Sequence, residues 1–277
     1  MEKAGDVVLD YLRAQVGVLQ TLEDGVLSDE PDAVHRSRVA TRRMRSALAT
    51  FEPLFAHRRV RRLRSELAWH AAELGAPRDA EVLRDGLLAA LDSIGVAVDA
   101  AQRREVSNRL TDAHARAHGE LVAAMVTPRY DALRRALTCW QAAPELTAAA
   151  AAPAQPMLHG LLDRARGRAA IRYAAALADP ASLGGWHEVR KAAKAVRYGA
   201  EALAPVFGRR ALRHAAAWEA VTDALGEVQD SVVAQEALAD LTGDPVIDAL
   251  LAFQSGRGHA ALAHGRAELD TALAAGL

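Results

Sequence analysis

Two short segments of this 277-residue chain repeat the same spacing of one histidine and three cations. The pattern is H-x2-R-x3-[RK]-x2-R, and its members are His35, Arg38, Arg42 and Arg45 in the first segment and His187, Arg190, Lys194 and Arg197 in the second. On an α-helix these offsets fall within an arc of about 80°, so each set forms one cationic face. Such a face suits an anionic ligand, which would relieve the repulsion among its cations.

The distribution of charge supports this interpretation better than the total does. The chain has 34 Lys and Arg against 35 Asp and Glu, a net charge of −1. Residues 34–64 and 186–214 together hold half of the cations and only three of the acids. Cations at i,i+3 and i,i+4 repel by a few tenths of a kcal/mol per pair. Solvated helix faces are the usual explanation of such runs, but they give no reason for the repetition, and we expect an anionic ligand.

The rest of the chain predicts an all-α protein rich in Ala, Leu, Arg and Glu. Aromatic residues are 4% of the chain, which disfavours a protein that stacks bases, and no apolar run is long enough to span a membrane. Cys139 is the only cysteine, and the N-terminus does not resemble a secretory signal. The expected helices cover residues 3–26, 32–50, 56–74, 80–93, 97–125, 128–142, 157–178, 186–203, 209–225, 230–241 and 244–274.

The repetition extends over nearly 50 residues in each half and predicts a duplicated helical unit. With an offset of 152, Pro53 aligns with Pro205 and Phe55 with Phe207. With an offset of 151, Leu74-Gly75 aligns with Leu225-Gly226, Asp79 with Asp230, and Val82 with Val233. An Ala- and Pro-rich segment lies between the halves. The predicted division is a first bundle over 1–146, a linker over 147–156 and a second bundle over 157–277.

Several of these residues have simpler interpretations. Asp79 and Asp230 each follow an expected helix end, so we interpret them as helix N-caps; orienting an arginine of the cationic faces is the alternative role. A histidine that is buried or hydrogen-bonded at a helix start is the alternative for His35 and His187. His114 and His118 have the i,i+4 spacing of metal ligands, but no third ligand accompanies them, and we predict no metal site. We also predict no cofactor.

The duplicated motif, the Pro-x-Phe that follows it, the Leu-Gly-x3-Asp-x2-Val segment and the Pro128-Arg129-Tyr130 helix resemble the CHAD family, the conserved histidine α-helical domain. The resemblance covers nearly the whole chain. It implies two bundles of about four main helices each, related by a pseudo-two-fold axis, with a basic central channel that binds inorganic polyphosphate. It implies that the eight motif residues contact the ligand. Secondary contacts are expected from Arg58, Arg62, Lys191, Tyr198, Arg209 and Arg213.

The function expected from these observations is non-enzymatic binding of polyphosphate in the cytoplasm, including association with polyphosphate granules. The expected partner is this polyanion, with no membrane and no nucleic acid. Two alternatives stay open. One is a polyphosphate or triphosphate hydrolase or phosphotransfer enzyme that uses a histidine as acceptor. The other is a basic scaffold for nucleic acid or an acidic protein.

Overall fold

A computed structural model describes residues 2–96, 98–239 and 244–277, and within them all the regular secondary structure is helical. This confirms the predicted all-α class. Two isolated β-bridges occur, but the described residues form no strand. No helix in these residues has the length and apolar character needed to cross a membrane.

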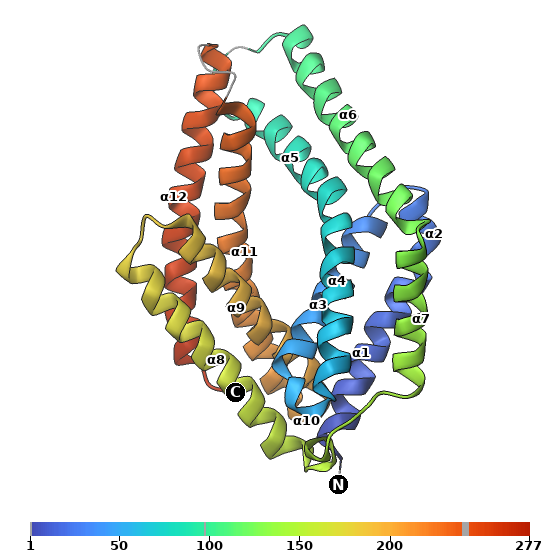
Figure 1. The fold of residues 1–277 in the computed structure, drawn as a ribbon. Helices are drawn as coiled ribbons and strands as arrows, with labels where there is room; N and C mark the ends of the chain where they lie inside the picture. Colours follow the sequence, from blue (N-terminus) through green and yellow to red (C-terminus); the bar gives the residue numbers. More distant parts are fainter. Residues whose placement is uncertain (1, 97, 240–243) are drawn as a thin grey trace.

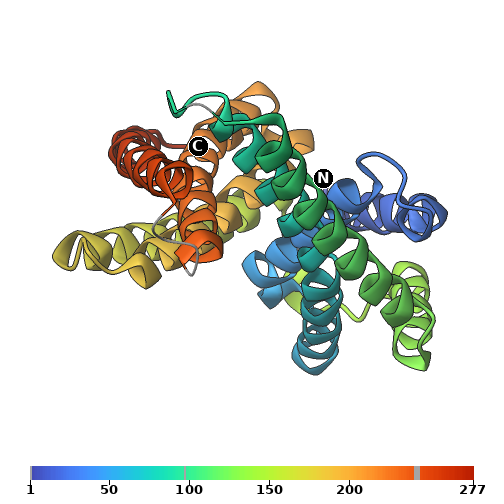
Figure 2. The same cartoon turned by 90° about the horizontal axis from the view of Figure 1, so that it is seen from above.

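Residues up to 151 form a first group of helices. Its members are α1 (Ala4–Thr21), α2 (Glu23–Leu27), α3 (Ala33–Thr50), η1 (Glu52–Leu54), α4 (His57–Glu73), α5 (Gly75–Leu91), α6 (Ala100–Met125), α7 (Pro128–Ala142) and η2 (Ala148–Ala151). The second group consists of α8 (Ala154–Ala178), α9 (Leu183–Ala202), α10 (Ala204–Phe207), α11 (Arg209–Leu238) and α12 (Pro245–Ala274). Seen from above, α8 and α12 lie on one side of the molecule and α1 and α7 on the other (Figure 2).

The helix break expected at Gly226 is in error, whereas the break expected at Gly75 occurs one residue earlier, at Leu74. Helix α11 runs without interruption through Gly226, because this stretch is buried against α9 and α12 and the packing outweighs the low helix propensity of glycine. Helix α5 begins at Gly75 and contains Pro77 in its first turn, where the missing N–H of proline costs nothing. Asp79 and Asp230 therefore lie inside helices, and their interpretation as N-caps is wrong.

Other boundaries differ by a few residues. The helix expected over 3–26 is divided at Leu22, and α8 begins at Ala154, inside the expected linker. The ends of the helices expected over 97–125 and 230–241 include residues outside those described. Within the segment 147–156, Ala150 is buried, and the carbonyl of Ala152 accepts a hydrogen bond from the N–H of Ala4 at 2.9 Å. The proposed division into domains stays a prediction.

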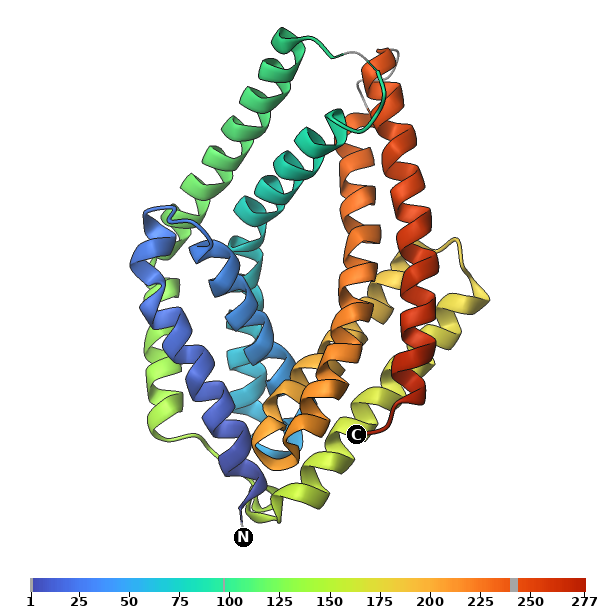
Figure 3. The same cartoon turned by 180° about the vertical axis from the view of Figure 1, so that it is seen from behind.

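Helices α3 and α9 pack against each other near the middle of the molecule (Figures 1 and 3). Their apolar sides join one hydrophobic core that also includes parts of α1, α8 and α11. Met44 and Leu48 of α3, Phe51 directly after α3, and Val189 and Val196 of α9 are fully buried in it. Because each helix buries its apolar side, its cationic face is turned out of the core.

A second apolar contact joins the two groups of helices farther along α5 and α11. Leu87 and Leu91 of α5 cluster with Ala234 and Leu238 of α11 and with Leu250 of α12. Figure 3 shows α5 rising toward α11 and α12 at this end of the molecule. The two contacts together fix α3 and α5 opposite α9 and α11.

The close approach at Gly199 of α9 gives a test of this packing. A Cβ atom at Gly199 would lie 2.8 Å from Leu162 and 3.4 Å from Thr50, at the meeting point of α3, α8 and α9. We expect Gly199→Val to lower the free energy of unfolding by about 1–3 kcal/mol through overpacking. Gly167→Val on α8, where nothing lies within 4 Å of the added Cβ, is the control. Equal urea denaturation curves for the two variants would contradict the tight crossing.

Candidate anion-binding site

The two cationic faces line one pocket of about 530 Å³ between α3 and α5 on one side and α9 and α11 on the other. Six of the eight predicted residues line it, and they are His35, Arg38, Arg42, His187, Arg190 and Lys194. Arg78 and Arg257 add two further cations, and Asp79 and Asp230 are the carboxylates in the lining. Residues 150 positions apart in the chain therefore contribute to one strongly cationic cavity.

The two aspartates each lie near one arginine of a cationic face. Arg38 Nη1 forms an ion pair with Asp79 Oδ1 at 2.8 Å. Arg190 interacts electrostatically with Asp230, and its Nε donates to the carbonyl of Thr222 at 3.2 Å. Asp230 touches solvent, but the concave pocket desolvates its carboxylate, which raises its pKa, and Arg190 opposes this effect. The alternative role of these aspartates, orienting the arginines, agrees with this geometry.

Gly226 explains why a glycine occupies the middle of α11. A Cβ atom there would lie 2.8 Å from Nη2 of Arg190, so the glycine gives the guanidinium room to lie along the helix. The glycine belongs to the repeated Leu-Gly-x3-Asp segment, which the sequence had suggested was a helix end.

Lys194 and Arg42 both line the pocket, and neither forms an ion pair with a carboxylate of the described residues. Burial is the main reason that the pKa of Lys194 falls to about 6, and the nearby charges of Arg190, Arg42 and Arg38 lower it further. The Nε of Arg42 is buried and donates a hydrogen bond to no described residue. An anion placed between these two side chains would satisfy the Nε and restore the charge of Lys194.

The two histidines stand at the mouth of the pocket in different environments. Desolvation lowers the pKa of His35, and the positive charges of Arg78 and Arg42 add to this effect. The Nδ1 of His187 lies 3.3 Å from Oε1 of Gln229, which occupies the position of Arg78 in the repeat. His35 is half-buried and His187 is exposed, so neither ring is buried at its helix start, but the contact with Gln229 agrees with a hydrogen-bonded His187.

Arg45 and Arg197 do not line the pocket. Arg45 is exposed on α3. Arg197 is held by carboxylates: its Nε lies 3.3 Å from Glu201, its Nη1 lies 3.6 Å from Asp223, and its Nη2 donates to Glu219. Glu201 also accepts from Arg43 at 2.8 Å and from the hydroxyl of Tyr11 at 3.3 Å. This network connects α1, α3, α9 and α11.

The secondary positions also lie outside the pocket lining. Arg58, Arg209 and Arg213 are exposed, and Arg62 lines a separate groove between α4 and α7. Lys191 forms an ion pair with Glu188 at 2.6 Å, and Tyr198 is buried between the guanidinium groups of Arg43 and Arg197. The polar pocket residues that the sequence did not single out are Arg78, Gln229, Gln254 and Arg257. Arg78 and Gln229 could have been found from their place beside the repeated aspartates, whereas Arg257 has no such signal.

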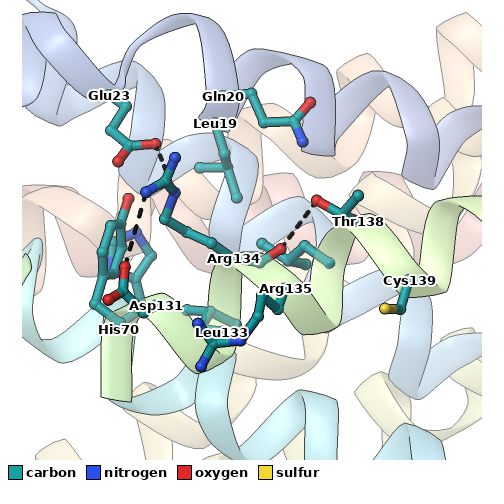
Figure 4. Close-up of a pocket in the computed structure, with 12 residues that line it drawn as sticks. Leu19, Gln20, Glu23, His70, Asp131, Leu133, Arg134, Arg135, Thr138 and Cys139 are labelled. Carbon is teal, nitrogen blue, oxygen red and sulfur yellow. Dashed lines mark hydrogen bonds and ion pairs between the residues drawn. The ribbon is translucent and has the colours of Figure 1, made fainter. Parts of the chain in front are cut away.

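A larger cavity of about 640 Å³ lies between α1 and α7, and its charges are balanced (Figure 4). Arg134 lies 3.2 Å from Glu23 and 3.8 Å from Asp131. Burial lowers the pKa of His70 on its wall to about 4, which keeps the ring neutral at pH 7. The cavity lacks the excess of cations that distinguishes the pocket between α3 and α9.

His114 and His118 have the spacing of metal ligands, but the sequence predicts no metal site at this pair. His114 lies 3.0 Å from Asp29 and 3.1 Å from the carbonyl of Pro77, and His118 lies 2.8 Å from the carbonyl of Val26. These contacts join α6 to α2, to the loop that follows α2 and to the first turn of α5. The described residues contain no group of three or more metal-ligating side chains close enough to hold an ion.

The fold and the site define a class of protein: an all-helical protein in which two cationic helix faces line one pocket. The family model of the CHAD domain matches residues 10–239, and the chain belongs to the CHAD domain family. This confirms the resemblance seen in the sequence motifs.

Two solved structures are similar over almost their full lengths. PptA from Streptomyces chartreusis has a TM-score of 0.77 and 27% identity, with 98% of this chain and 99% of that chain covered. The CHAD domain from the plant Ricinus communis has a TM-score of 0.74 and 22% identity, with 97% and 92% covered. A search of the curated proteins gave no match.

The different environments of Arg45 and Arg197 give a stability test. Arg197 is 16% exposed and Glu201 is 18% exposed, so removing the guanidinium leaves a half-buried carboxylate with one partner fewer. We expect Arg197→Gln to lower the free energy of unfolding by roughly 1–3 kcal/mol. Arg45→Gln, on the exposed face, should change it by less than about 0.5 kcal/mol. Equal losses in urea denaturation would show that the carboxylate network is not stabilising.

Proposed function

We propose that this protein binds inorganic polyphosphate in the pocket between α3 and α9. The observation that carries the proposal is the convergence of both cationic faces on one cavity, where six Arg and Lys side chains face two carboxylates. Repulsion among these cations is a cost that a polyanion relieves on binding. The desolvated amine of Lys194 and the unpartnered Nε of Arg42 mark the centre of the proposed site.

The shape and composition of the pocket support a chain of phosphates over a nucleic acid. Apart from the two histidines, its lining contains no aromatic ring on which a base could stack. A volume of about 530 Å³ exceeds the need of a single phosphate, and the cations are distributed over both walls. Several phosphate groups could therefore be bound at once, as in the basic channel between two repeats that the resemblance implies.

We propose a binding role without catalysis. A histidine that accepts a phosphoryl group is commonly oriented by a carboxylate, whereas Nδ1 of His187 faces the amide oxygen of Gln229. The pocket carboxylates lie next to the arginines Arg38 and Arg190. The cytoplasm and the surface of polyphosphate granules are the proposed locations, since polyphosphate is the proposed partner.

Neutralising the pocket tests the site directly. The variant Arg38→Gln, Arg42→Gln, Arg190→Gln and Lys194→Gln should bind long-chain polyphosphate weakly, with the slope of log K against log salt reduced by about 3. The control, Arg168→Gln, Arg172→Gln, Arg209→Gln and Arg213→Gln, removes four exposed arginines from α8 and α11. Titration calorimetry at several salt concentrations gives the affinity of each variant and the slope of log K against log salt.

Three outcomes would contradict the proposal. An unchanged slope in the pocket variant would place the site elsewhere. Single-stranded DNA of equal charge binding the wild-type protein as tightly as polyphosphate would favour a general polyanion scaffold. Release of phosphate on incubation with polyphosphate and Mg²⁺ would favour the enzyme.

The low pKa of Lys194 gives a pH prediction. In the free protein this amine loses its proton near pH 6, and a bound anion raises its pKa, so binding takes up a proton above pH 6. His35, whose pKa is lowered too, acts in the same direction. Affinity should therefore be highest near pH 6 and fall as pH rises through the bound-state pKa values.

Affinities for polyphosphate measured at pH 6 and pH 8 test whether binding weakens as the pH rises. Lys194→Arg keeps the charge at both pH values and should reduce the difference. Asp79 and Asp230 also face the pocket, so Asp79→Asn with Asp230→Asn separates carboxylate titration from that of the amine. Equal affinity of the wild-type protein at the two pH values would show that neither Lys194 nor the imidazoles contact the ligand.

A further inference from the structure

Arg45 and Arg197 occupy the same position in the two repeated motifs, but their surroundings differ in charge. Arg197 contacts Glu201, Glu219 and Asp223. The two halves align with an offset of 152 residues up to Phe207 and of 151 residues beyond it. In this alignment, the first half has alanine at the positions of all three acids. The alanines are Ala49, Ala68 and Ala72.

The first half therefore leaves its arginine without carboxylates. No ion pair to Arg45 is found in the part of the chain that the structure describes, and the side chain is exposed. Partial burial and then the positive charge of Arg64 lower the pKa of Arg45, so a second guanidinium lies close by. In the second half, alanine (Ala215) stands in the position of Arg64.

Arg45 extends the cationic face of α3 beyond the residues that line the pocket. Arg45 follows Arg42 by one helical turn on the same face of α3, and Arg64 lies on α4, which packs antiparallel beside α3 (Figure 1). The carboxylate closest to Arg64 is Glu52, 3.6 Å away, and Glu52 also binds Nδ1 of His57 at 2.7 Å. Because Glu52 is shared between Arg64 and His57, the surface around Arg45 and Arg64 keeps a net positive charge.

The corresponding side of the second half is acidic at its surface. Glu219 and Asp223 are 49% and 69% exposed, and they neutralise Arg197 while still facing solvent. A phosphate chain leaving the pocket meets like charge along α11 and opposite charge along α4. The two exits of a site built from repeated motifs are thus electrostatically unequal.

We propose that Arg45 and Arg64 form an additional subsite for the part of a polyphosphate chain that extends beyond the pocket, so that long chains leave it along α3 and α4. This inference rests on the proposed function. The ligand of this subsite is polyphosphate that is too long to be enclosed between α3 and α9. Chain-length preference then depends on residues outside the pocket.

The test compares two ligands, tripolyphosphate and a long-chain polyphosphate, with two variants of equal charge. Arg45→Ser with Arg64→Ser should weaken binding of the long chain by about tenfold and leave the affinity for tripolyphosphate within about twofold. Arg210→Ser with Arg213→Ser removes two exposed arginines from α11 and should change neither affinity. Circular dichroism and a urea denaturation curve show whether each variant is folded.

A second variant checks the subsite without removing an arginine. Ala68→Glu introduces on α4 the acid that Glu219 provides on α11, and we expect it to lower the affinity for the long chain alone.

The outcomes separate this inference from the proposed function. Long-chain affinity that is unchanged in Arg45→Ser with Arg64→Ser, while the wild-type protein binds both ligands, overturns the subsite alone. Equal weakening by the α11 control would assign the effect to net charge and would also overturn it. Wild-type protein that binds neither ligand overturns the proposed function and the subsite with it.

Discussion

The packing of α3 against α9 is the constraint on which the site depends. Each helix carries cations on one face, and bringing the two faces together costs electrostatic free energy. The fully buried side chains of Met44, Leu48, Phe51, Val189 and Val196 on the opposite faces supply the hydrophobic stabilisation that offsets this cost. The second contact, between α5 and α11, prevents the walls from separating under the repulsion.

The repeated motif does not produce repeated environments. Arg38 and Arg190 each lie near one aspartate, Asp79 and Asp230, so the pocket itself is close to symmetric in charge. One helical turn beyond it, Arg197 has become part of a stabilising network, whereas its counterpart Arg45 has not. Two segments with the same residue spacing can therefore place corresponding arginines in different surroundings, one within a carboxylate network and the other exposed.

The helical class, the two cationic faces and most of the pocket residues could be predicted from the sequence. They depend on periodicity and spacing, which are local properties of the chain. The interpretation of Asp79 and Asp230 as caps was wrong for a tertiary reason: packing keeps α11 continuous through Gly226, and Pro77 is accommodated within the first turn of α5. Local turn signals alone could not reveal this.

The sequence by itself determined which residues share a helix face, because 3.6 residues per turn fix that geometry whatever the fold. Only the tertiary structure decided which of them meet. It placed Arg42 and Lys194 in one cavity, enclosed Arg197 among three carboxylates and left Arg45 in solvent. The physical reason is that ion pairing and desolvation depend on neighbours from distant parts of the chain, and these are fixed by packing rather than by spacing.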